Sequence, residues 1–289
     1  MRREWLYAWL MLLPALVVLA TFMHVPAIKT VIASFYSTPH GLRPSRFIGL
    51  ANYQRMIADP VFWQAMRNNL IYAVIFVPLS MAMALVMALL VQGRIVGRAF
   101  LRMAFFTPTV LPLIAVANIW IFFYTPGFGL IAQIRDLFGL PALNLLGTGT
   151  TALYAVAAVA VWKEAGFFII FYLAALQTIP PSLVEAAQLE GASRWQIFRR
   201  VTLPLIMPTT LFISVNAVID AVRLIDHIFQ MTNGGPNNAT NLLFYYIYRV
   251  GFQFWDTSYA ATLTVVMIVI LSLLALGQIV LVDRRVHYK

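Results

Sequence analysis

The sequence predicts an all-α membrane protein with six transmembrane helices, and two observations lead to this fold class. First, 62% of the 289 residues are hydrophobic and 10% are charged, with a mean hydropathy of +0.83. Soluble domains are usually about 45–50% apolar and about 25% charged, so this composition argues against a soluble enzyme. Second, the apolar residues gather into blocks of about 18 to 25, the length that crosses a hydrocarbon layer of about 30 Å.

The first predicted span covers residues 6–23 and follows two arginines, Arg2 and Arg3. A cleaved signal peptide has a similar start, but this apolar block is longer than a usual signal core. No small-x-small cleavage site ends it. We therefore expect the block to be retained as a transmembrane helix.

Five more apolar blocks follow, and residues 1–289 are predicted to form one transmembrane domain. A basic segment separates the second block from the third, and the polar segment 179–204 separates the fourth from the fifth. Before the sixth block, the turn formers of residues 233–238 must reverse the chain. The five predicted spans are residues 70–91, 103–123, 151–176, 205–230 and 259–282.

Basic residues predict which side of the membrane the termini face. Six spans place both termini on one side, which carries eleven basic residues in four short segments, against seven in three longer loops opposite. Because Lys and Arg are enriched in cytoplasmic loops, both termini are predicted to be cytoplasmic. The eleven residues are Arg2, Arg3, Arg94, Arg98, Arg102, Arg194, Arg199, Arg200, Arg284, Arg285 and Lys289.

The net charge of +10 predicts contact with anionic membrane lipid rather than with nucleic acid. No basic run interleaved with aromatic residues occurs, so the footprint of a nucleic-acid binder is missing. The chain has no cysteine, and its four histidines have no metal-ligand spacing. No metal site and no catalytic residue are predicted, and each histidine is expected at the surface or interface: His24, His40, His227 and His287.

The polar segment 179–204 predicts two short helices joined at a glycine. Pro180 and Pro181 prevent a continuous helix from the fourth span. Gly191 suits the left-handed residue that closes a helix. Pro204 and Pro208 then mark the entry to the fifth span.

Both short helices have the spacing of a capping box, Ser182 with Glu185 and Ser193 with Gln196. Small side chains dominate the first helix and let another backbone approach closely. The residues alone leave two interpretations open: a cytoplasmic docking element, or a helix that only lies among lipid headgroups. The small residues are Ala186, Ala187, Gly191 and Ala192.

Glu185-Ala186-Ala187, Gly191 and Leu203-Pro204 at this spacing resemble the EAA loop of permease subunits from binding-protein-dependent ATP-binding cassette importers. The likeness covers nearly the whole chain. Residues 47–53, 232–236 and 246–254 are similar to the sugar-type branch, which includes maltose and glycerol-3-phosphate permeases. Two positions depart from the family pattern but keep charge or shape: Glu190, where Asp is usual, and Val201, where Ile is usual.

The resemblance implies a type I importer permease fold in a bacterial or archaeal cytoplasmic membrane. It also implies a second permease subunit, usually a different chain, two ATPase subunits and an extracytoplasmic binding protein. This chain has no G-x-x-x-x-G-K-[ST] loop, so ATP and Mg²⁺ are expected on the ATPase and no cofactor is expected here. The implied ATPase-coupling residues are Glu185, Ala186, Ala187, Glu190, Gly191 and Ala192.

Charges inside the predicted spans are candidates for the transport pathway. Each isolated charge at mid-bilayer costs at least about 2.5–3.5 kcal/mol. Lys163 and Glu164 lie in the fourth span, and Asp220, Arg223 and Asp226 lie in the fifth. The fifth-span charges either form a self-neutralising ladder that only aids insertion, or line a hydrophilic cavity. The resemblance favours the cavity, with a substrate pathway of Glu164, Phe167, Asp220 and Arg223.

Similar depth on consecutive spans predicts that Glu164 and Arg223 approach each other. Lys163 points about 100° away around the helix and is expected to meet a neighbouring helix or to snorkel. The two positive and three negative charges sum to −1, which disfavours a dianionic substrate. A sugar or oligosaccharide is therefore the predicted cargo, and glycerol-3-phosphate or another polyol or phosphodiester is the alternative.

Four uncharged residues are weaker pathway candidates. Phe167 and Tyr124 either stack on a sugar ring or simply pack. Asn118 and Asn216 either contact the ligand or join two helices. In the third outer loop, residues 232–240 either dock the binding protein or only reverse the chain.

Two other classes of membrane protein fit less well. An intramembrane enzyme needs a nucleophile–base pair or a metal, and no H-E-x-x-H or G-x-S-x-G motif occurs. An ion-coupled secondary carrier would use Asp220 as its ion site, but no inverted half-and-half repeat is visible. Such a carrier would transport by itself under an ion gradient, whereas a permease subunit would not.

Overall fold

The computed structural model describes residues 2–39, 41, 43–93 and 97–283, most of which are helical. These residues form two compact units. The first unit comprises the described parts of 1–62 and 246–270, and the second those of 63–245 and 271–289. The helices α4 (Pro60–Gln92) and α15 (Thr257–Asp283) contribute to both units. The prediction of a single transmembrane domain over residues 1–289 stays a prediction.

Four described helices are long and apolar enough to cross a membrane, and the number rises to six if two bent helix pairs each make one span. The predicted all-α membrane fold is therefore confirmed. The four are Trp9–Ala33, Pro60–Gln92, Ala152–Gln177 and Thr257–Gln278, and the bent pairs are Arg98–Val110 with Leu113–Tyr124 and Arg194–Leu205 with Met207–Met231.

In the first unit, the N-terminal helix runs to Ala33 rather than ending near Met23. A π-helical turn, η1 (Ala20–His24), joins α1 (Arg2–Leu19) to α2 (Val25–Ala33) without a break. Pro26, which has no N–H to donate, lies just after this π-helical turn, where the regular i→i−4 hydrogen-bond pattern is already interrupted. The other helical segments of this unit are α3 (Ala51–Ala58), the last residues of α14 (Leu243–Tyr248), η3 (Arg249–Gln253) and the first half of α15.

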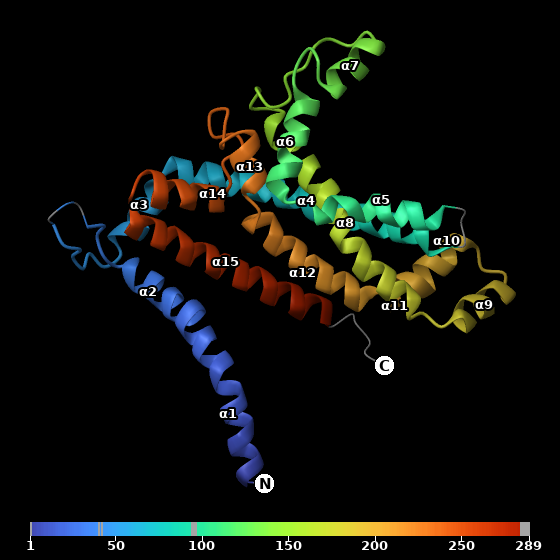
Figure 1. The fold of residues 1–289 in the computed structure, drawn as a ribbon, viewed down its shortest axis with the longest axis horizontal. Coiled ribbons are helices and arrows are strands. Elements are labelled where there is room, and N and C mark those ends of the chain that lie inside the picture. Colours follow the sequence, from blue (N-terminus) through green and yellow to red (C-terminus); the bar gives the residue numbers. More distant parts are fainter. Residues whose placement is uncertain (1, 40, 42, 94–96, 284–289) are drawn as a thin grey trace. The chain divides into compact units, whose positions relative to one another are not determined.

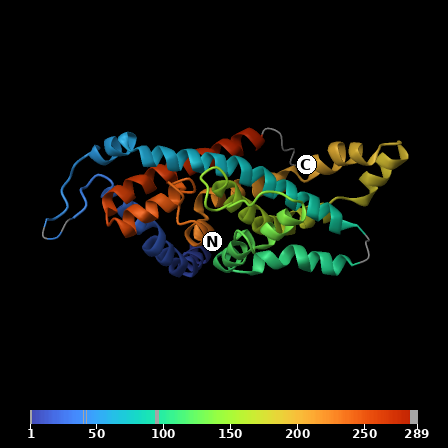
Figure 2. The same ribbon diagram turned by 90° about the horizontal axis from the view of Figure 1, so that it is seen from above.

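The second unit is built around α8 (Ala152–Gln177). This helix contacts α5 (Arg98–Val110), α6 (Leu113–Tyr124), α12 (Met207–Arg223) and α13 (Asp226–Met231). Figures 1 and 2 both show α5 lying along α8. By contrast, α7 (Leu130–Leu137) buries no residue.

The predicted spans 103–123 and 205–230 are both interrupted. α5 and α6 meet at an angle of 104° because Leu111 and Pro112 are extended. Pro112 lacks an N–H and disfavours helix at the residue before it. In the fifth span, α12 ends at Arg223, Leu224 is extended, and α13 begins at Asp226.

α5 and α8 approach most closely at Gly166. A Cβ atom on this glycine would lie 2.6 Å from the carbonyl oxygen of Phe105 and 2.9 Å from Oγ1 of Thr109. The space between the two helices therefore has no room for a side chain at position 166. Small residues permit this close packing between membrane helices.

We predict that Gly166→Ala destabilises the purified chain by about 1–3 kcal/mol, because the added methyl overlaps the backbone of α5. The measurement is the apparent melting temperature in detergent. Gly277→Ala on α15 is the matched control, because nothing lies within 4 Å of its Cβ position. Equal melting temperatures for the two variants would contradict the close contact.

Candidate functional site

The candidate coupling loop contains two short helices, α9 (Pro181–Leu189) and α10 (Arg194–Ile197). Between them, Gly191 has φ +76°, the left-handed conformation that glycine adopts without strain. Ser193 and Gln196 form the predicted capping box, in which each side chain accepts a hydrogen bond from the other's backbone N–H. The predicted pair of helices is therefore present.

The capping box predicted for Ser182 and Glu185 is not formed. α9 begins at Pro181, with Pro180 as its N-cap and no side-chain cap hydrogen bond. A proline at the first helical position has its φ preset and has no N–H to satisfy, so the prolines themselves start this helix. They also separate it from α8, which ends at Gln177.

The loop presents its side chains outward. No residue of α9 is buried, and none of the six predicted coupling residues is buried. Leu189 is 90% exposed and Trp195 is 65% exposed. Large apolar side chains that are exposed together mark an interaction surface. Exposed apolar side chains also suit a helix that lies among lipid headgroups, so the docking interpretation stays a prediction.

The loop is also a short connection between the two charged helices. α9 follows the end of α8, and α10 continues through η2 (Phe198–Thr202) and α11 (Leu203–Leu205) into α12. A displacement of the loop therefore acts on α8 and α12 together.

The charges on α8 and α12 form one ion pair on each helix. Lys163 Nζ lies 3.5 Å from Glu164 Oε1, and Arg223 Nη2 lies 3.1 Å from Asp220 Oδ1. Glu164 and Asp220 are 8% and 9% exposed, whereas the Arg223 side chain is 67% exposed. Asp226 follows the helix break and is exposed.

Of the two expectations for Lys163, snorkelling is contradicted, and contact with a neighbouring helix stays a prediction. The Lys163 side chain is 12% exposed and turns back to Glu164, so it does not snorkel, because the long stem lets the ammonium reach its neighbour. Among the described residues, Glu164 and Arg223 make no ion pair with each other. Their approach across a cavity stays a prediction.

The four weaker candidates make contacts within the chain, and their part in ligand binding stays a prediction. Tyr124 is buried and its hydroxyl donates to the Ala155 carbonyl at 3.1 Å. Phe167 is half-buried between Phe168 and Phe171. Asn118 accepts a hydrogen bond from Gln230 at 2.8 Å, which joins α6 to α13. Asn216 donates to Phe212 of its own helix.

His227 is fully buried, so its prediction as a surface or interfacial residue is wrong. Its Nε2 lies 3.0 Å from the Tyr72 hydroxyl on α4, and its Nδ1 has no hydrogen-bond partner in the described part of the chain. The break after Arg223 redirects the chain and turns α13 inward. His24 is exposed as expected, and His40 and His287 lie outside the described residues.

The reversal at residues 232–240 is held by its own hydrogen bonds and by α4. Thr232 and Thr240 share a hydrogen bond of 2.7 Å between their hydroxyls. Gln64 and Asn68 of α4 donate to backbone carbonyls of residues 237 and 238. Asn233 and Asn237 remain exposed at its tip.

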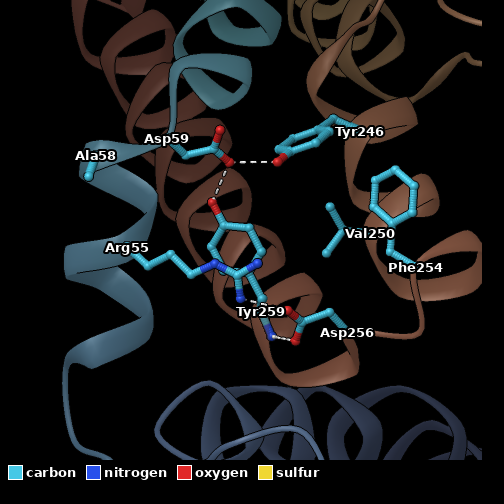
Figure 3. A pocket seen from close by; sticks show the side chains of 8 residues that line it. All are labelled: Arg55, Ala58, Asp59, Tyr246, Val250, Phe254, Asp256 and Tyr259. Carbon is cyan, nitrogen blue, oxygen red and sulfur yellow. Dashed lines mark hydrogen bonds and ion pairs between the residues drawn. The ribbon is translucent and has the colours of Figure 1, made fainter.

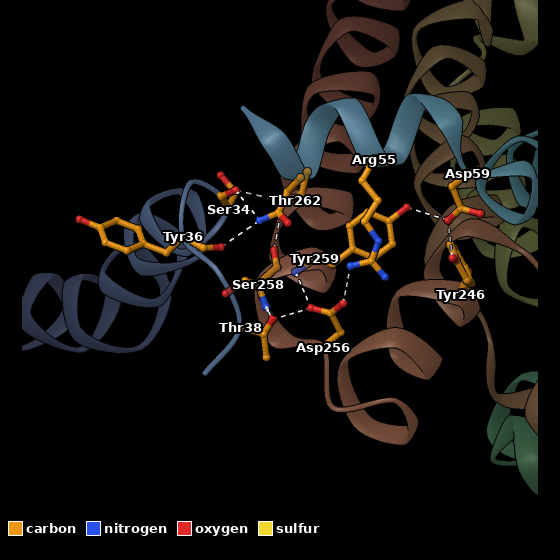
Figure 4. Close-up of polar contacts among 11 residues, drawn as sticks. Ser34, Tyr36, Thr38, Arg55, Asp59, Tyr246, Asp256, Ser258, Tyr259 and Thr262 are labelled. Atoms are coloured by element: carbon orange, nitrogen blue, oxygen red, sulfur yellow. Dashed lines mark hydrogen bonds and ion pairs between the residues drawn. The ribbon is translucent and has the colours of Figure 1, made fainter. Parts of the chain in front are cut away.

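The first unit holds a polar cluster that the sequence analysis missed (Figures 3 and 4). Asp59 Oδ2 accepts hydrogen bonds from the hydroxyls of Tyr246, at 2.5 Å, and Tyr259, at 2.7 Å. Arg55 Nη1 lies 2.6 Å from Asp256 Oδ2, and its guanidinium lies 4.1 Å from the Tyr259 ring centre. These five residues line a pocket of about 610 Å³.

Both carboxyl groups of this cluster are held in the charged form. Burial alone would raise their pKa values. At Asp59, hydrogen bonds from two tyrosines and from the backbone of residues 61 and 62 together outweigh burial and keep its pKa below the ordinary value. At Asp256, hydrogen bonds from Thr38 and Arg55 lower the pKa in the same way. Residues from 38 to 259 take part, so no local sequence motif could have predicted the cluster.

Of the eleven basic residues that predict the orientation, four lie outside the described residues: Arg94, Arg284, Arg285 and Lys289. The described backbone begins at Arg2, and the cytoplasmic placement of the termini stays a prediction.

Comparison with known proteins places these features in context. Residues 77–288 match the family described as "Binding-protein-dependent transport system inner membrane component". The trehalose/maltose transport system permease protein MalF of Thermococcus litoralis is 34% identical over 86% of this chain and 85% of that protein. The sn-glycerol-3-phosphate permease UgpA of Agrobacterium fabrum is 30% identical over 97% and 96%.

A solved structure shows the same fold. The chain matches a bacterial alginate ABC transporter, in complex with an alginate pentasaccharide-bound periplasmic protein, with a TM-score of 0.84 and 25% identity. The match covers 96% of this chain and 93% of that chain.

We predict that acid destabilises the first unit through Asp59. The carboxylate's hydrogen bonds contribute fully above about pH 4, the ordinary pKa of Asp, and are lost as the pH falls through the lowered folded pKa. Melting temperatures measured from pH 6 to pH 3 should fall more steeply for the wild type than for Asp59→Asn. At the acid end, the wild type should have lost about 1 kcal/mol more of its free energy of unfolding than the variant. Asp136→Asn, at an exposed residue of α7, should retain the wild-type slope. Identical slopes for all three proteins would refute the role of Asp59.

Proposed function

The chain belongs to the family of inner membrane components of binding-protein-dependent transport systems, and we propose that it forms half of the sugar pathway in an ATP-driven importer. It is a permease rather than a catalytic subunit. The observation that carries the mechanism is the exposed coupling loop, which joins the two helices that bear the buried charges.

In this mechanism, a separate ATPase subunit receives α9 in a cleft, and its closure moves α8 and α12 together. The exposed Leu189 and Trp195 supply apolar contact, and the small residues allow close approach. The coupling residues are Glu185, Ala186, Ala187, Glu190, Gly191 and Ala192. ATP and Mg²⁺ are held by the ATPase, because this sequence has no phosphate-binding loop.

The full importer contains a second permease, two ATPase subunits and an external binding protein. The alginate relative was solved with its periplasmic protein, which supports the last of these. We place both termini in the cytoplasm on the density of basic residues. The binding protein docks on the outer loops, including residues 232–240.

The proposed cargo is a sugar or oligosaccharide. It is supported by the relative for trehalose and maltose and by the excess of carboxylates over basic groups among the five span charges. Glycerol-3-phosphate is the second candidate, because the UgpA relative spans nearly the whole chain. The pathway residues are Glu164, Phe167, Asp220 and Arg223. Measuring which compounds the cognate binding protein retains, across sugars and glycerol phosphates, separates the two cargo classes.

We predict that Glu185→Lys lowers solute-stimulated ATP hydrolysis of the reconstituted complex at least about tenfold, because reversing an interface charge disrupts docking. Membrane insertion should be unchanged, since the residue is exposed. Asp136→Lys is the matched control: it makes the same charge reversal at an exposed residue of α7, outside the coupling loop.

Two results would contradict this function. One is normal stimulation in Glu185→Lys together with intact transport. The other is solute uptake by the purified chain alone under an ion gradient, which would identify a secondary carrier instead.

A further inference from the structure

A groove between α5 and α8 combines a basic end with an apolar floor. It has a volume of about 450 Å³ and lies beside the point where α8 ends and the coupling loop begins. Arg102 and Gln177 lie at this end. The remaining lining residues are apolar: Met103, Phe106, Ile169, Ile170, Leu173 and Ala174.

The groove begins close to the tight contact between the two helices at Gly166. At Gly166 they touch without an intervening side chain. The apolar part of the groove follows α8 from Ile169 to Ala174, which is about 7.5 Å at about 1.5 Å per residue. This part is therefore long enough to hold a stretch of hydrocarbon chain along the span.

Two arginines near the basic end, of which Arg102 lines the groove, have guanidinium nitrogens without acceptors among the described residues. Nε and Nη2 of Arg102 are buried with no hydrogen-bond partner in the described part of the chain, and so is Nε of Arg98. The two residues are four apart on α5 and therefore share one face. Both arginines are half-buried. A buried guanidinium nitrogen without an acceptor is unfavourable, so this position favours a bound anion.

The outer surface of α5 carries exposed apolar side chains. Phe100, Met103 and Val110 are each at least 60% exposed. A ligand at this groove must therefore be anionic at one end, where the arginines lie, and apolar along the rest. Basic pockets between membrane helices near the cytoplasmic surface suit anionic lipid headgroups.

We propose that this groove binds an anionic phospholipid, with its phosphate on Arg98 and Arg102 and an acyl chain along Phe106, Ile170 and Leu173. The lipid then lies against the end of α8 that leads into the coupling loop. The site is separate from the ATPase-docking surface and from the proposed sugar pathway.

The test is native mass spectrometry of the purified full-length chain with phosphatidylglycerol and with phosphatidylcholine of the same acyl chains. Wild type should bind phosphatidylglycerol more tightly, and Arg102→Gln should weaken this binding about tenfold, toward the level of phosphatidylcholine. Arg199→Gln removes one positive charge from an exposed residue and should change the binding less than about twofold. Equal binding of the two lipids to wild type, or unchanged binding to Arg102→Gln, would overturn the proposal.

A second variant, Ala174→Phe, leaves both arginines in place and fills the apolar part of the groove. It should also weaken phosphatidylglycerol binding, and wild-type binding would overturn the acyl-chain placement. An excess of inorganic phosphate should fail to displace the lipid. Displacement would identify a site for free phosphate instead.

A measurement on the assembled complex distinguishes a groove that is occupied by lipid from one that is covered by another subunit. Because the chain has no cysteine, Ala174→Cys can carry a single spin label. Frequent collisions with dissolved oxygen would show that the groove faces lipid. Protection from oxygen would show that protein covers it and would overturn the proposal.

Discussion

Close packing of α8 is the constraint on which the second unit depends. Membrane helices gain little from the hydrophobic effect against one another, so van der Waals contact must hold them together. Small residues on α8 supply this contact, and at Gly166 the α5 backbone leaves no room for a side chain. The same packing keeps Glu164 and Lys163 inside protein rather than in lipid. One helix, α8, therefore provides both the close packing of the second unit and the burial of Lys163 and Glu164.

The two units are stabilised in different ways. In the second unit, apolar helix packing dominates, and the buried carboxylates Glu164 and Asp220 pair with basic neighbours on the same helix. In the first unit, a network of two carboxylates, two tyrosines and an arginine ties together segments that are far apart in the chain. Thr38 adds a third segment by donating to Asp256. The first unit is therefore sensitive to pH, whereas the helix packing is sensitive to side-chain size.

Sequence reasoning mostly succeeded where the signal is local. The apolar blocks predicted an all-α membrane fold, and Gly191 and Ser193 predicted the joint and cap of the coupling loop, although the capping box predicted at Ser182 is not formed. It failed where distant segments decide the outcome. His227 is buried only because the chain breaks at Leu224 and α13 turns toward α4. The partners of Asp59 lie almost 200 residues away, so no spacing rule could identify them.

The exposure of Leu189 and Trp195 has a consequence for protein turnover. A copy of the chain that has not assembled with its partner subunits has two exposed apolar side chains on the coupling loop. Chaperones and proteases act on chains that expose such groups. Surplus copies would thus be recognised and removed, so that degradation matches the number of these subunits to that of their partners.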